Sequence, residues 1–217
     1  LLLGVIGLAL SSVASAESID VTGDTVQYSV DGKRAEFVGN VEARFNDSVM
    51  YADKLVVSIG ADGNRYVATG SPMRGECANC GKSPLSFWAG QVAYDATAAD
   101  LSLSNGITVC LGAQCAKGRL TATQGEWLRM AQKAWLSGEV QGHWQQENEA
   151  ATHIEAQRVE YDIGNGLVAL RGGAKLSRDG NELLGESIEF NLSSGAMRAD
   201  GGDSGKRVRA VFGEDAN

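Results

Sequence analysis

The side chains with the strongest chemistry in this sequence are four cysteines, which form two close pairs. Cys77 and Cys80 are separated by two residues, and Cys110 and Cys115 flank a segment long enough for a tight turn. Four thiolates can hold zinc tetrahedrally, and a C-x-x-C pair can carry redox chemistry where a helix N-terminus lowers a thiol pKa. In an oxidising compartment the same pairs form disulfides.

The remaining candidates for catalysis are weak. The two histidines, His143 and His153, lie in polar stretches typical of solvated side chains. The segment 202–205 is similar to the nucleophile segment of trypsin-like proteases, but Lys206 replaces the second glycine of that motif. The segment 75–83 is similar to a phosphate-binding loop, yet it has five residues between its glycines where the motif needs four. We therefore expect no enzyme activity and no cofactor.

The first residues indicate export. An apolar run over residues 1–10 is followed by Val13-Ala14-Ser15-Ala16, a small-x-small ending typical of a secretory signal peptide. We expect cleavage after Ala16, and a leader truncated at its start because the charged n-region is missing. A membrane anchor is the alternative, but it needs about 20 apolar residues. The expected organisation is a signal peptide over 1–16, one domain over 17–212 and a disordered tail over 213–217.

Export favours disulfides over the other possible functions of the cysteines. We expect disulfides Cys77–Cys80 and Cys110–Cys115 because each pair is close in sequence and an exported chain meets an oxidising compartment. Four cysteines allow three pairings, so cross-pairing of the two loops stays open, as do a metal site and a redox function. The net charge of −8 and the pI near 4.8 argue against nucleic acid as a partner, since its backbone attracts cationic surfaces.

An internal repeat organises the chain. The three corresponding segments are Val26-Gln27-Tyr28, Val92-Ala93-Tyr94 and Val159-Glu160-Tyr161, whose tyrosines lie 66 and then 67 positions apart. Related half-units begin near Ala52, Gly118 and Gly185. A shared register across three copies predicts an array of similar units.

Within each half-unit the apolar residues alternate with polar ones. In 36–45 the apolar and polar side chains fall on opposite faces, and Asp-Gly or Asn-Gly turns separate the runs. This is the pattern of half-buried antiparallel strands joined by hairpins. Residues 123–144 also fit a helical period, but the register of the other copies favours two strands there. The sequence therefore predicts an all-β protein.

The same residues carry a resemblance to a known family. Three segments, 37–41, 50–57 and 154–162, resemble the OstA-like domains of the lipopolysaccharide-transport proteins of the LptA, LptC and LptD type. Leu170-Arg171-Gly172-Gly173-Ala174 and 184–190 repeat the pattern near the end. The resemblance covers both outer copies, whereas the middle copy departs from it in its cysteines and in Trp127, Trp135 and Trp144.

The resemblance implies a fold and a function. The fold is an open β-jelly-roll, a V-shaped bent sheet of repeated antiparallel strands. The implied function is that of a periplasmic protein that binds lipopolysaccharide by its lipid A acyl chains and bridges the two membranes. Its partners would be LptC-like and LptD-like OstA-fold domains and further copies of itself, joined head to tail.

On this interpretation the inward-facing residues bind the lipid. They share the period-two register, and we expect them to face one continuous interior. The candidate lipid-binding residues are Val26, Tyr28, Phe37, Val41, Leu55, Val57, Leu103, Val159, Tyr161, Leu170, Leu176, Ile188 and Phe190. Two alternatives stay open: a disulfide-stabilised β-repeat adhesion module at the cell surface, and a cysteine-dependent metal or redox module.

Overall fold

The computed structural model describes residues 19–45, 48–61, 63–78, 84–128, 130–145, 150–191, 194, 196–202 and 207–212. The predicted signal peptide (1–16) and the predicted tail (213–217) lie outside these residues, as do Cys80 and the segment 203–206.

The described chain forms a single antiparallel sheet of 16 strands. The strands are β1 (Asp20–Thr22), β2 (Thr25–Tyr28), β3 (Arg34–Phe45), β4 (Ser48–Gly60), β5 (Gly63–Cys77), β6 (Leu85–Asp95), β7 (Asp100–Ser104), β8 (Ile107–Leu111), β9 (Gly118–Ala122), β10 (Gln124–Leu128), β11 (Lys133–Trp144), β12 (Thr152–Asp162), β13 (Leu167–Arg178), β14 (Asn181–Asn191), β15 (Met197–Asp200) and β16 (Arg209–Val211). A short 3-10 turn, Ala113–Cys115, follows β8. The prediction of an all-β protein is confirmed.

The strands β10 and β11 decide the ambiguous segment 123–144 in favour of strands. Trp127 lies opposite Ala134, and Glu126 opposite Trp135, in an antiparallel hairpin. The helical period in the sequence arises because the turn between the strands shifts the alternation of apolar residues. Cross-strand pairing satisfies the backbone of both segments, so the register shared with the other copies prevails over the local helical pattern.

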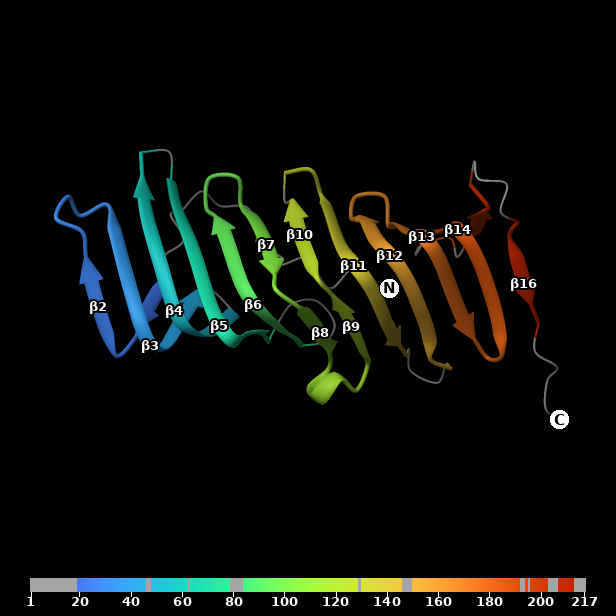
Figure 1. Ribbon diagram of the computed structural model, residues 1–217, viewed down its shortest axis with the longest axis horizontal. Coiled ribbons are helices and arrows are strands. Elements are labelled where there is room, and N and C mark those ends of the chain that lie inside the picture. The colour runs from blue at the N-terminus through green and yellow to red at the C-terminus, as the bar shows by residue number, and fades with distance from the viewer. Residues whose placement is uncertain are drawn as a thin grey trace.

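The sheet is folded along its length into two walls. The long strands pair with one neighbour over half their length and with another over the rest: β3 pairs with β2 and β1, and β6 pairs with β7 and β8. We call the half that contains β2, β7, β10 and β15 the first wall, and the half that contains β1, β8, β9 and β16 the second wall. Strands succeed one another in chain order along the long axis of the molecule, from β2 at one end to β16 at the other (Figure 1).

The crease between the walls is built from backbone irregularities. The ladders β3–β4, β11–β12 and β13–β14 each shift register at this line. Left-handed backbone pairs stand there at 39–40, 105–106, 138–139 and 172–173, all with positive φ. Extra residues of this kind bend a strand and increase its twist. Gly172 has φ of 79° and Gly173 has φ of 70°, a conformation that glycine adopts at no steric cost.

The interior between the walls is apolar and is divided into two clusters. One cluster lies in β3 to β6, around Val41, Leu55 and Met73, and the other lies in the later strands, around Val140, Leu170 and Ile188. Phe87 and Leu103 are partly buried and pack against both clusters. The two clusters therefore meet near β6 and β7, in the middle of the molecule.

Candidate functional site

The inner face of the first wall carries two rows of apolar side chains that run across the whole sheet. Residues directly opposite one another in an antiparallel ladder point to the same face, so the register alone defines each row. The first row is Val26, Phe37, Leu55, Ala68, Val92, Leu103, Gly125, Leu136, Val159, Leu170, Ile188 and Ala199. The second row is Tyr28, Ala35, Val57, Tyr66, Tyr94, Leu101, Trp127, Ala134, Tyr161, Val168, Phe190 and Met197.

A cavity of about 150 Å³ lies between the walls where the two core clusters meet. Its accessible surface is almost wholly apolar. The lining combines both rows of the first wall with residues of the second wall, among them Met50, Phe87 and Val109. An apolar cavity of this size stays dry and accepts an apolar ligand. The site can therefore hold hydrocarbon.

Several aromatic side chains that carry a polar atom line this cavity. Tyr66 and Tyr94 lie opposite each other with ring centroids 6.1 Å apart, and the Tyr66 hydroxyl accepts a hydrogen bond from Asn64 Nδ2 at 3.2 Å. Burial raises the pKa of Tyr161 above its ordinary value, and the neighbouring Asp162 adds to this effect, so the phenol stays neutral. The indole nitrogen of Trp127 is buried and has no hydrogen-bond partner among the described residues.

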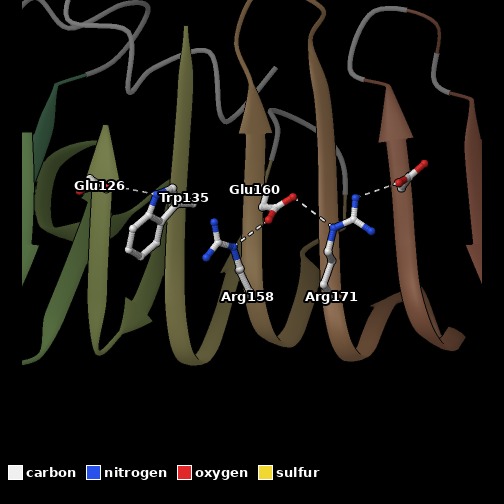
Figure 2. A network of polar contacts seen from close by, with 6 residues as sticks. Glu126, Trp135, Arg158, Glu160 and Arg171 are labelled. Atoms are coloured by element: carbon white, nitrogen blue, oxygen red, sulfur yellow. Dashed lines mark hydrogen bonds and ion pairs between the residues drawn. The ribbon is translucent and has the colours of Figure 1, made fainter. Parts of the chain in front are cut away.

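The outer face of the same wall is polar and tightly connected (Figure 2). Side chains from five successive strands, β10 to β14, form one network of hydrogen bonds and ion pairs. Its contacts are Trp135 Nε1 to Glu126 Oε2 at 3.0 Å, the Arg158 guanidinium over the Trp135 ring at 4.6 Å, Arg158 to Glu160 at 2.7 Å, Arg171 to Glu160 at 3.1 Å and Arg171 to Glu189 at 3.2 Å.

This network fixes which face is exposed to water. Partial burial acts to raise the pKa of Glu160, but hydrogen bonds from Arg171 and Arg158 outweigh it, so the pKa lies below its ordinary value. The carboxylate is therefore ionised at neutral pH and holds both arginines on the outer face. An apolar inner face and a charged outer face make the wall amphipathic from β10 to β14.

A protein-family profile described as "LptA/(LptD N-terminal domain) LPS transport protein" matches residues 20–196. The chain belongs to this family. Its members are lipopolysaccharide (LPS) transport proteins, as the resemblance read from the sequence implied. No curated protein matches the chain. Among solved structures, the chain is similar to LptH of Pseudomonas aeruginosa, whose title calls it the LptA homologous periplasmic component of the lipopolysaccharide transport device. The two sequences are 12% identical, the match covers 91% of this chain and 96% of that chain, and the TM-score is 0.29.

The predicted residues of this LptA/LptD-type chain fall into three groups. Leu55, Leu103, Val159 and Tyr161 line the central cavity. A second group is buried in the two clusters away from it: Val41, Val57, Leu170, Ile188 and Phe190. The third group is less buried: Phe37 and Leu176 are half-buried and pack against the clusters, whereas Val26 and Tyr28 are exposed.

Val26 and Tyr28 require a correction to the expected interior. Their pairing with Phe37 and Ala35 places them on the inner face, as the alternation predicted, but they are 46% and 67% exposed. Among the described strands, β2 pairs with β3 alone, so no strand of this chain lies on its other side. These two side chains therefore stand at an open end of the interior.

The sequence interpretation missed most cavity residues of the middle copy. Tyr94, Leu101 and Trp127 line the cavity, yet only Leu103 was proposed from that part of the chain. The repeat contained the signal, because Val92-Ala93-Tyr94 aligns with Val159-Glu160-Tyr161, whose valine and tyrosine are lining residues.

The three cysteines among the described residues are disulfide-bonded. Cys110 and Cys115 form the predicted disulfide, which excludes both cross-pairing of this pair and a four-thiolate zinc site. Cys77 is also disulfide-bonded, and since Cys80 lies outside the described residues, the pairing Cys77–Cys80 stays a prediction. In the described part of the chain, no group of three or more His, Cys, Asp or Glu is arranged to hold a metal ion.

The two histidines are neighbours on the sheet. His143 lies opposite His153 with ring centroids 5.7 Å apart, on strands β11 and β12. Neither borders the central cavity among the described residues that line it. Over the same described residues, no helix has the length and apolar character that crossing a membrane would need.

Proposed function

We propose that this chain is a periplasmic protein that carries LPS by holding lipid A acyl chains between its two walls, and that it bridges components of the inner and outer membranes. The two apolar rows that cross the first wall and the cavity between the walls carry this proposal. Each CH₂ group moved from water into such an interior contributes about 0.8 kcal/mol. Export through the predicted leader and membership of an LPS-transport family support the periplasmic location.

The groove requires no catalytic group. Acyl chains need apolar wall area, and the cavity supplies it from both rows and from the second wall. The sugar and phosphate portion of the lipid would remain in water at the rim between the walls. The outer network around Glu160 keeps the other face of the first wall hydrated, so the lipid has one apolar face to enter.

Site-specific photo-crosslinking tests the lipid site. We expect a photoreactive amino acid at Leu103 or Val159, both cavity residues, to capture LPS. The same group at Gln27, Glu42 or Arg158 points to the outer face and should capture none. Equal capture by the inner and outer positions would refute the groove.

Assembly through the two ends is the second part of the proposal. Among the described strands, β1 and β2 pair with β3 alone, and β15 and β16 pair with β14 alone. Such edges have unpaired backbone donors and acceptors and recruit strands from other chains. Copies joined in this way, and OstA-fold domains of LptC-like and LptD-like partners, would extend the apolar interior from one molecule to the next. A head-to-tail contact is heterologous and leads to open filaments.

Light scattering over a concentration series tests assembly. We expect the mass of the wild type to grow with concentration, and Val26→Pro in β2 or Ala210→Pro in β16 to reduce that growth by removing a backbone donor at one edge. Met130→Ser is the control, since Met130 is 87% exposed in the turn after β10 and its loss tests general hydrophobic association. A wild type that stays monomeric at every concentration and binds no partner domain would exclude bridging.

A further inference from the structure

Two aromatic side chains join the walls beyond the central cavity. Trp144 and Phe190 stack with ring centroids 6.2 Å apart and an angle of 25° between their planes. Trp144 lies opposite Gly118 of β9 and so belongs to the second wall, whereas Phe190 lies opposite Met197 of β15 and belongs to the first. Strands β12 and β13 separate β11 from β14 along the sheet, a spacing of about 14 Å. The two rings therefore meet across the interior and not along one wall.

We call this contact between Trp144 and Phe190 the aromatic clasp. Trp144 is the last residue of β11, and Phe190 is the second-last residue of β14. Both residues thus lie at strand ends, on the rims of the two walls, with the crease at the opposite side of each wall. The side chains are only 9% and 8% exposed. The aromatic clasp therefore brings the two rims together and closes the mouth between the walls in this part of the molecule.

The central cavity stops before it reaches the aromatic clasp. Its lining extends as far as Val159 and Tyr161 of β12, and it includes none of the described residues of β13 and β14. Beyond it the interior is filled, because Val168, Leu170 and Ile188 are fully buried in one packed cluster. Acyl chains in the cavity would meet this filled region before they reached the edge formed by β15 and β16, where the proposed assembly would extend the interior into the next molecule.

We propose that the aromatic clasp is a gate on the lipid path. When it is closed, it confines acyl chains to the central cavity, and when the rims part, it admits them to the interior of β13 and β14. This inference rests on the proposed function and adds to it a point at which passage is controlled. Opening breaks the ring contact between the walls, and the loss of one aromatic pair shifts an equilibrium by about two- to tenfold.

Photo-crosslinking on the two sides of the aromatic clasp measures passage. A photoreactive amino acid at Leu103 reports lipid in the cavity. The same group at Leu183 reports lipid beyond it, since Leu183 is half-buried against the later cluster and lies opposite Ala210 of β16. We expect Trp144→Ala to raise the capture of LPS at Leu183, relative to capture at Leu103, by about two- to tenfold. Phe190→Leu should act in the same direction and keeps an apolar side chain in the cluster.

Trp88→Ala is the matched control. Trp88 lies opposite Arg74 on the outer face of the second wall, where the guanidinium is 5.7 Å from the centre of its ring. This variant loses an indole of the same size without touching the aromatic clasp. It should keep the wild-type ratio of capture at Leu183 to capture at Leu103, so a higher ratio in this variant would attribute the effect to general loosening and overturn the gate.

Fluorine NMR of the fluorotryptophan-labelled wild type gives a second measurement that requires no clasp variant to bind lipid. The Trp144 resonance, assigned by its loss in Trp144→Phe, should shift in step with capture at Leu183 as LPS is added, while the Trp88 resonance stays in place. Capture at Leu103 with an unchanged ratio in both clasp variants, or a Trp144 resonance that ignores LPS while Leu183 captures it, would overturn the gate and leave the lipid groove intact. No capture at either position in any of these proteins would overturn the proposed function and the gate with it.

Discussion

Two adjacent glycines at the crease allow the cost of backbone strain to be measured separately from the cost of a steric clash. Gly172 and Gly173 both have positive φ, at 79° and 70°. A Cβ atom on Gly172 would lie 2.7 Å from Gln157 Cβ and 3.0 Å from its Cγ, whereas one on Gly173 would have nothing within 4 Å. Gly173→Ala should therefore cost only the left-handed strain, about 1 to 2 kcal/mol. Gly172→Ala adds overpacking of about 1 to 3 kcal/mol to the same strain.

Urea denaturation followed by tryptophan fluorescence measures both variants on one scale. We expect Gly172→Ala to be less stable than Gly173→Ala by about 2 kcal/mol, and to melt roughly 4 to 8 °C lower in a thermal scan. The contact is tested by a double-mutant cycle with Gln157→Gly, in which Gly172→Ala should cost only the strain because the Cβ and Cγ atoms are gone. Equal stability of the two alanine variants, or no rescue by Gln157→Gly, would refute the steric account of the crease.

Three further predictions concern stability. Leu170→Ala should lower the free energy of unfolding by about 3 to 5 kcal/mol because Leu170 is fully buried, whereas Val26→Ala at the open edge should change it by less than about 1 kcal/mol in denaturant titrations. Replacing Cys110 and Cys115 by serine opens a loop of sequence separation 5 and should cost about 2 kcal/mol, seen as a lower melting temperature under oxidising conditions; no difference from the wild type would contradict it. Glu160→Gln should lower the free energy of unfolding by up to about 1 kcal/mol at neutral pH, a small loss because the Glu160 side chain is 38% exposed. This loss should fade as the pH drops below 4.5, the ordinary pKa of a glutamate, and through the lower pKa of Glu160 in the folded protein. A loss that persists at pH 2 would refute the ion-pair origin.

The sequence predicted the faces of the strands better than their burial. Val159 and Tyr161 point inward as expected because successive side chains of a strand alternate between faces. Burial depends on what lies beside the strand, and Val26 has the correct face but no strand beyond β2 to cover it. Local alternation contains no information about a missing neighbour.

The crease and the cavity could not be predicted from alternation. In β12 the inward residues are Val159 and Tyr161 in the first wall but Ile154 and Ala156 in the second, so the parity changes across the bend. One extra residue in a strand exchanges its two faces, and the sequence pattern alone does not show where that residue is inserted. The sequence predicted that Trp127 lies in a strand. It could not predict that the indole N–H of Trp127 is buried without a hydrogen-bond partner among the described residues, because this burial depends on how the two walls enclose the side chain. Groove walls and filled cores have the same composition, which hides an empty space from sequence analysis.

The long strands contribute to both walls, so the two walls belong to one continuous hydrogen-bonded sheet that changes direction at the crease. A force that spreads the walls therefore meets a different resistance from a force that pulls the two ends of the sheet apart. Spreading the walls apart twists the few crease dihedrals near residues such as Gly172 and Gly173 and leaves the ladders paired. Pulling the two ends apart along the long axis of Figure 1 instead loads the interstrand hydrogen bonds and peels the outermost strands first. The molecule is thus mechanically soft across its interior and stiff along the line on which its strands succeed one another.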